Sequence, residues 1–188
     1  MDLSRDGKRV AIGAIFNDGG GFRNGHVRVY DWTGSAWEQA GEDIDGEAPA
    51  DYSGTSVSLS GDGLRVAIGA PGNDGATGSG YYDGHVRVYE MNGSSEWVKL
   101  GKDIDGIAEL DGFGSTVSLS FDGRRLAAGA GSNDSNGQSS GHVRVFEYIG
   151  TTWSQMGSDI RGDAPFDRFG SSVSIRHEFF FEFSPTDD

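Results

Sequence analysis

The segment GHVRVY at residues 25–30 recurs at residues 84–89 and returns as GHVRVF at residues 141–146. Around it, related segments recur in one order: a Leu-Ser pair, Asp-Gly, VAIGA, Asn-Asp with glycines, a Trp and DIDG. The copies span residues 3–58, 59–118 and 119–174, with lengths of 56, 60 and 56 residues. A tandem repeat requires each copy to be one supersecondary unit, so this repeat determines the fold.

Each copy predicts four short β-strands, because β-branched residues alternate with polar ones between glycine and Asp-Gly boundaries. No stretch has sustained helical periodicity, which makes the predicted class all-β. The first strand is predicted at 55–60, 115–120 and 171–175, and the second at 9–14, 65–70 and 125–130. The third begins at His26, His85 and His142, and the fourth runs from Trp37, Trp97 and Trp153 to the Asp-Ile pair.

The connections between these strands predict the architecture. Tight Asp-Gly turns join the first strand to the second, and short hairpins join the third to the fourth. Four antiparallel strands in tandem copies are typical of β-propeller blades. We therefore predict three four-stranded blades of a larger or oligomer-closed propeller at residues 1–175, followed by a divergent tail at 176–188. The long loops at 15–25, 71–84 and 131–141 all emerge on one face.

Charge, hydrophobicity and cysteine content restrict the classes of partner and environment that the chain suits. The 29 acidic groups outnumber the 15 basic ones and give a formal charge of −14, which repels nucleic acid and favours cations or basic partners. No apolar run approaches the ~20 residues needed for a membrane span. There is no cysteine, hence no disulfide framework. The N-terminal sequence is not a signal peptide, so localisation stays open; an extracellular or lumenal site is favoured if a signal peptide lies upstream.

Short glycine motifs resemble the FG-GAP repeats of integrin-α-type propellers. Phe113-Gly114 and Phe169-Gly170 match the FG element, with Ser53-Gly54 as a weaker copy, and Gly69-Ala70-Pro71 matches GAP. The resemblance covers residues 3–175 and implies a seven-bladed propeller that serves adhesion or ligand binding through its loop-rich face.

One departure from that family concerns calcium. Calcium-binding members carry a DxDxDG-type loop between the first two strands, whereas this chain has four-residue turns with one carboxylate each, at Asp6, Asp62 and Asp122. Such a turn does not supply the six to eight oxygen ligands that calcium takes. We therefore expect no cofactor; calcium remains possible without its usual motif.

Residues in the long loops are the candidate ligand-binding positions, because sites concentrate on loops held by a rigid scaffold. The Asn-Asp pairs could bind a cation or a glycan, or could form Asx turns that end a strand. Adjacent aromatic residues in the longest loop suit partner contact or packing on the loop itself. The candidates are Asn17, Asp18, Asn73, Asp74, Tyr81, Tyr82, Asn133 and Asp134.

Other polar residues are predicted to have structural roles. The repeated histidines His26, His85 and His142 sit at equivalent positions of radiating blades, too far apart to converge on one metal. Carboxylates such as Asp43, Asp45, Asp103 and Asp105 flank apolar anchors and match no ligand spacing. The copies are nearly equivalent and carry no catalytic motif, so the sequence predicts a non-enzyme with no catalytic residue.

The leading functional hypothesis is a non-catalytic binding or adhesion module for a protein or glycan ligand. The alternatives are a truncated structural fragment without independent function, and part of a carbohydrate-active propeller enzyme whose catalytic residues lie in other blades. Three blades also leave two open faces with apolar and aromatic area, which predicts self-association.

Overall fold

The computed structural model describes residues 1–74 and 82–175, and its regular structure is entirely β-sheet. Tyr81 and the predicted tail at 176–188 lie outside the described residues. Within the described part no helix is long and apolar enough to cross a bilayer, as expected from the sequence.

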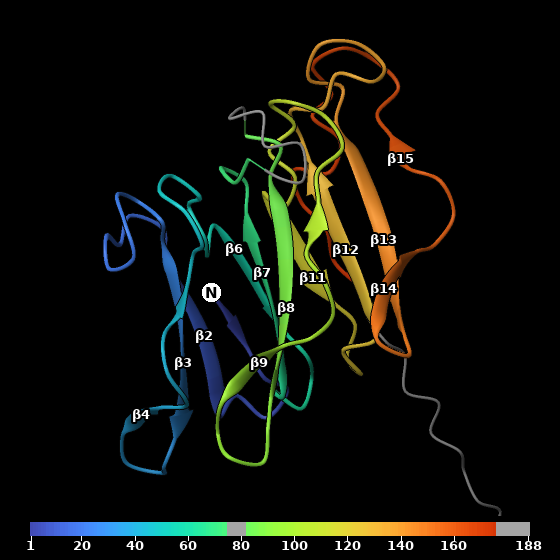
Figure 1. The fold of residues 1–188 in the computed structure, drawn as a ribbon. Helices are drawn as coiled ribbons and strands as arrows, with labels where there is room; N and C mark the ends of the chain where they lie inside the picture. The colour runs from blue at the N-terminus through green and yellow to red at the C-terminus, as the bar shows by residue number, and fades with distance from the viewer. Residues whose placement is uncertain (75–81, 176–188) are drawn as a thin grey trace, which may run out of the picture.

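Three antiparallel sheets follow one another along the chain and stand side by side (Figure 1). The first contains β1 (Asp2–Leu3), β2 (Arg9–Ala14), β3 (His26–Trp32), β4 (Trp37–Gln39) and β5 (Ile44–Asp45). The second contains β6 (Ser56–Leu59), β7 (Arg65–Ala70), β8 (His85–Met91), β9 (Trp97–Lys99) and β10 (Ile104–Asp105). The third contains β11 (Thr116–Leu119), β12 (Arg125–Ala130), β13 (His142–Ile149), β14 (Thr152–Gln155) and β15 (Ile160–Arg161).

Each sheet is one propeller blade, which confirms the predicted all-β fold class. The first three strands pair in chain order, and the fourth is split into two short pieces that both pair with the third. The split corrects the prediction of a continuous fourth strand. In the first blade it falls near Gly41, whose φ of 80° is incompatible with extended backbone. Residues 171–175 run beside the third blade but form no strand, because no neighbouring second strand is present among the described residues.

Neighbouring blades approach each other backbone to backbone through glycine. A Cβ added to Gly13 would lie 2.0 Å from the carbonyl oxygen of Gly54, and one added to Gly69 would lie 1.9 Å from that of Gly114. Gly129 and Gly170 repeat the contact at 2.1 Å. Only glycine permits this spacing, which explains why glycine recurs at both positions in every copy.

Side-chain hydrogen bonds also cross each boundary. At the outer edge the indole Nε1 of Trp97 donates to Ala40 O, and that of Trp153 donates to Leu100 O, both at 2.9 Å. Along the inner strands the Leu119 amide donates to Ser58 Oγ at 3.0 Å. Trp97 and Trp153 therefore fill the wedge between blades, and each satisfies its indole N–H group across the boundary.

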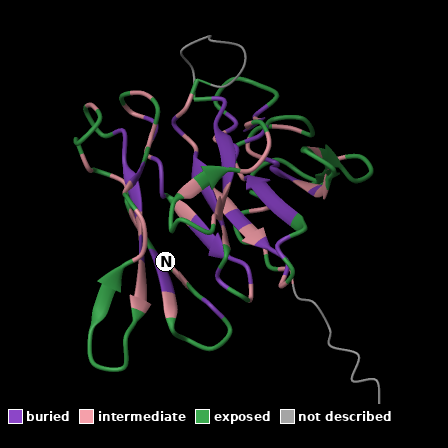
Figure 2. Ribbon diagram, turned by 60° about the horizontal axis from the view of Figure 1, so that its bottom comes forward, coloured by how far each residue is buried: buried purple, intermediate pink, exposed green. Residues whose placement is uncertain are grey.

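The core lies between the blades. β2 and β7 have the same sequence, RVAIGA, yet Ile12 in β2 is 41% exposed whereas Ile68 in β7 is 2% exposed. Figure 2 shows the buried residues concentrated on the strands where the sheets face one another. A blade of this repeat thus buries its apolar side chains only when a second blade packs against it.

The glycine contact gives a direct stability test. We expect Gly69→Ala to lower the free energy of unfolding by about 1–3 kcal/mol, because the new methyl group overpacks the boundary between the second and third blades. Gly93→Ala is the matched control, since a Cβ there meets no atom within 4 Å. Urea unfolding followed by tryptophan fluorescence measures both variants, and equal stabilities would contradict the close-packing explanation.

Candidate functional site

A histidine and an arginine two residues apart begin the third strand of every blade. Side chains at i and i+2 share one face of a strand, so His85 and Arg87 of β8 lie on the same side. The short strand β10 pairs with β8 with Asp105 opposite His85 and Ile104 opposite Val86. That register brings Asp103, the residue before β10, beside Arg87.

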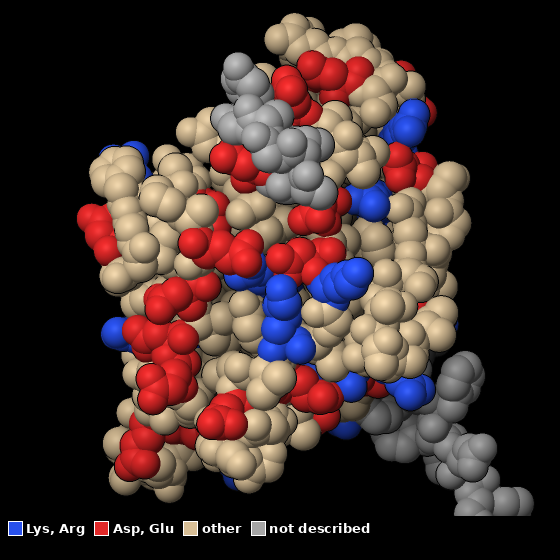
Figure 3. Space-filling model, viewed as in Figure 1, with Lys and Arg blue, Asp and Glu red and all other residues tan. Residues whose placement is uncertain are grey.

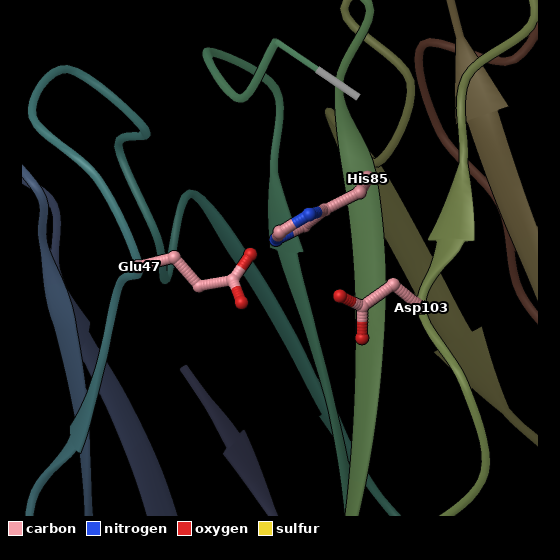
Figure 4. A group of neighbouring side chains, drawn as sticks. All are labelled: Glu47, His85 and Asp103. Carbon is pink, nitrogen blue, oxygen red and sulfur yellow. The ribbon is translucent and has the colours of Figure 1, made fainter. Parts of the chain in front are cut away.

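A fourth side chain reaches this group from the first blade. Glu47 follows β5, and its carboxylate lies across the blade boundary near His85 and Asp103 (Figure 4). One potential ligand atom from each of these three residues lies within 4.8 Å of the others. We call Glu47, His85, Arg87 and Asp103 the boundary cluster.

Ion pairs hold the boundary cluster together. The Nη2 atom of Arg87 pairs with Glu47 Oε1, and it donates to Asp103 Oδ2 at 3.3 Å. Lys99 adds a second cation, with Nζ 2.7 Å from Asp103 Oδ1. Figure 3 shows Lys and Arg side chains grouped at the middle of the face in view, between acidic side chains. The cluster is therefore charge-balanced within a strongly acidic protein.

Burial sets the protonation states. Desolvation lowers the pKa of His85 despite the opposing charge of Asp103, so the imidazole is neutral at pH 7. For Asp103, burial raises the pKa, but the hydrogen bond from Lys99 and the charge of Arg87 outweigh it and the net shift is downward. The cluster thus combines a neutral imidazole, which can accept a proton, with an ionised carboxylate.

One donor in the cluster has no acceptor. The Nε atom of Arg87 is buried and has no hydrogen-bond partner among the described residues, although the residue is only 7% exposed. Leaving such a donor unpaired costs about 1–3 kcal/mol.

A metal ion fits this group poorly. Glu47, His85 and Asp103 are the only group of three potential ligands among the described residues, but Arg87 and Lys99 already neutralise the two carboxylates. The turn carboxylates are also engaged: Asp62 Oδ1 accepts from Ser60 Oγ at 2.6 Å and from the Leu64 amide at 2.9 Å. The expectation of no cofactor, with calcium as the open alternative, stays a prediction.

The equivalent boundary between the second and third blades differs in chemistry. In the aligned copies the position of Glu47 is occupied by Ile107. Arg144, the equivalent of Arg87, donates to the Asp105 carbonyl at 2.8 Å and lies over the rings of Phe113 and Phe146. No carboxylate reaches it from the Glu47 position, so the mixed acid–base group is confined to the first boundary within the described residues.

The third histidine is also different. Arg161 replaces an aspartate of the earlier copies and bonds Asp159 at 3.1 Å. His142 is fully buried, and both of its ring nitrogens lack hydrogen-bond partners among the described residues. In the first blade, by contrast, His26 Nδ1 lies 3.5 Å from Asp43 Oδ2. The copies are alike in backbone but not in polar contacts.

Sequence analysis assigned His85 and Asp103 structural roles and did not single out Glu47 or Arg87. The available signal was a single aligned column, in which Glu47 and Asp163 are acidic whereas Ile107 is apolar. Periodicity could not show that this column faces the histidine of the next blade, because the contact crosses a boundary between copies.

The predicted loop residues lie elsewhere. Asn73 Nδ2 donates to Asp51 Oδ1 at 3.2 Å and Asn133 Nδ2 donates to Asp111 Oδ2 at 2.8 Å, so both amides link neighbouring blades. Asn17 Oδ1 accepts from the Gly19 amide at 2.7 Å, an Asx turn.

The remaining loop candidates are more exposed. Asp18 and Asp134 each accept from a backbone amide five residues on, at 2.6 Å, and Asp74 is exposed. Tyr82 is 43% exposed with φ 53°. Ligand binding by these loop residues stays a prediction.

Comparisons with known proteins place the fold. No family model matches the chain, and no curated protein matches it either. Among solved structures it is similar to a Bacteroides fragilis protein described as a "putative 6-phosphogluconolactonase", with 15% identity and a TM-score of 0.57, covering 87% of this chain and 39% of that one. A Bacteroides uniformis protein with the same description gives 16% identity, a TM-score of 0.57, and coverages of 87% and 40%. The chain thus spans about two fifths of the length of these neighbours.

These comparisons correct the family assignment. The expected FG-GAP, integrin-α-like repeat and its cell-adhesion role are wrong, since the similar propellers carry lactonase names. The physical reason is that the Phe-Gly and Gly-Ala elements provide the glycines for the close contact between blades at Gly69 and Gly114. These elements therefore indicate how the blades pack and do not identify a family.

The functional prediction requires the same correction. The expected non-catalytic binding module, its fragment alternative and the absence of enzymatic activity are contradicted by neighbours named as enzymes. The premise that the copies are nearly equivalent was mistaken, because Glu47 makes the first boundary chemically distinct.

Buried carboxylates between the blades predict that the stability of the folded state depends on pH. Burial raises the pKa of Asp111 to about 6, against the opposing hydrogen bond from Asn133. The folded state therefore holds a proton that the unfolded state has released, and stability falls as pH rises from about 4 to 6. We expect Asp111→Asn to reduce this slope, measured by urea unfolding across that range. An unchanged slope would contradict the assignment.

Proposed function

We propose that the boundary cluster belongs to the active site of a propeller hydrolase that opens a cyclic sugar ester, a lactone. The observation that carries the proposal is Glu47, which gathers a neutral histidine, two carboxylates and a partly unpaired arginine at one blade boundary. The names of the fold neighbours supply the substrate class. Because the chain spans about two fifths of their length, the activity of a whole protein is part of the proposal.

Lactone hydrolysis needs a base for the attacking water and a donor for the carbonyl oxygen. Neutral His85 takes a proton from the attacking water as the water oxygen bonds to the carbonyl carbon. The guanidinium group of Arg87 supplies positive charge that stabilises the carbonyl oxygen as negative charge develops there. The ring C–O bond then breaks, and the departing oxygen takes the proton from His85, which leaves an open hydroxy acid.

The carboxylates position these groups. Glu47 and Asp103 bind Nη2 of Arg87 and so fix the guanidinium plane and the direction of Nε. Their charges also balance the positive charge of Arg87.

Hydrolysis of glucono-δ-lactone and of its 6-phosphate, followed by pH-stat against the spontaneous rate, tests the proposal. We expect His85→Asn to lower kcat/KM by roughly 10²–10⁴-fold, the contribution typical of a general base. His142→Asn is the matched control, since it occupies the same strand position in the third blade, where Ile107 stands in place of Glu47 across the boundary. Its activity is expected to stay near the wild-type value. A wild-type rate equal to the spontaneous rate, or equal losses in the two variants, would overturn the proposal.

A further inference from the structure

The two internal boundaries are built from the same set of contacts. Trp97 and Trp153 each donate to a carbonyl of the preceding blade, and Asn73 and Asn133 each donate to an aspartate there. Inner-strand amides, such as that of Leu119, donate to a side chain of the preceding first strand. These repeated contacts define two complementary faces, one with the donors and one with the acceptors, through which neighbouring blades pack.

The first blade carries the residues that would contact a preceding blade, and no such blade is present among the described residues. We call this side of the first blade the leading face. Trp37 is 45% exposed and Leu3 is 49% exposed, whereas the equivalent Leu59 is 5% exposed. With Val10, Ile12 and Tyr30, Trp37 lines an open groove of about 480 Å³. Asn17 faces no aspartate of a preceding blade among the described residues.

The third blade carries the other half, the trailing face. Phe169 is 41% exposed although the equivalent Phe113 is fully buried, and Ile160 is 52% exposed against 6% for Ile104. Met156 occupies the position of the carbonyls that accept from Trp97 and Trp153. Asp167 aligns with Asp51 and Asp111, the acceptors for the asparagines.

Charge on the two faces is complementary. Arg87 bridges Asp103 of its own blade and Glu47 of the preceding one, and its side chain is 9% exposed. On the leading face Arg28 pairs with one carboxylate, that of Asp43, among the described residues, and its side chain is 43% exposed. On the trailing face Asp163 occupies the position of Glu47. Joining the faces would therefore give Arg28 the second carboxylate that Arg87 already has.

Strand edges match as well. β1 pairs with β2 only at Val10 and Ala11, so Ile12 and Gly13 lack an inner partner in the described part of the chain. The segment at 171–175 lies against the third blade, where the Ile175 amide donates to Ser118 Oγ at 3.0 Å, and it pairs with no strand among residues 1–74 and 82–175. By the register of β6 on β7, its residues 172 and 173 would face Gly13 and Ile12. Its last two residues would then replace β1.

We propose that the leading face of one copy of this chain docks on the trailing face of a second copy, so that two copies close a six-bladed ring. The interface is head to tail: Trp37, Arg28 and Asn17 of one copy meet the Met156 carbonyl, Asp163 and Asp167 of the other. Such an interface closes into a ring when the rotation permits and otherwise builds open chains.

Sedimentation equilibrium of the full 188-residue chain tests this directly. We expect a mass twice the 19.9 kDa of one chain, without growth at higher concentration. Asp163→Arg places a cation opposite Arg28 and is expected to weaken association at least tenfold. Glu109→Arg makes the same charge change on an exposed loop away from both faces and is expected to leave the dimer intact.

Mixing separates the interface from general damage. Trp37→Asp disables the leading face and Asp163→Arg the trailing face, so each variant alone is expected to be a folded monomer by circular dichroism. An equimolar mixture retains one intact pair of faces and is expected to form a 1:1 dimer, weaker than wild type. A monomeric wild-type chain, a mass that keeps growing with concentration, or a mixture that stays monomeric would overturn the proposal, and the faces would then belong to other blades.

Discussion

The structure depends on backbone contact between glycines of neighbouring blades. Gly69 lies so close to the carbonyl of Gly114 that no side chain fits between them, and Gly13 and Gly129 repeat the arrangement. This contact sets the spacing of the sheets, and the spacing places Trp97 within reach of the Ala40 carbonyl and Ser58 within reach of the next inner strand. Every polar group that acts across a boundary, including those of the boundary cluster, depends on the same spacing.

Because the backbone repeats so closely, chemical difference between boundaries arises from single side chains. Glu47 supplies a carboxylate to Arg87 at the first boundary. At the second, where Ile107 replaces Glu47, Arg144 donates to the Asp105 carbonyl and to Gln155 Oε1 and lies over two aromatic rings. A repeat protein can thus keep one packing scheme and still build one distinct site, since the variable residue lies in a loop that the fold does not constrain.

Much of the fold could be predicted from the sequence, because strand periodicity and Asp-Gly turns are local signals. The predicted bounds of β2, β7 and β12 agree with the structure. The split in the fourth strand was not predicted, because it depends on the φ of Gly41 in its tertiary setting. The site was missed for a similar reason: the approach of Glu47 to His85 crosses a boundary between copies and has no local signal.

The central claim is that the boundary cluster, and not the equivalent position at the second boundary, binds the ring-opened product of lactone hydrolysis. Histidine side-chain NMR during titration with gluconate tests it most directly, since the product is stable and His85 and His142 occupy equivalent strand positions. The account predicts saturable shifts of the His85 ring signals with little change at His142. Unchanged His85 signals at saturating gluconate, or equal shifts at His85 and His142, would contradict it.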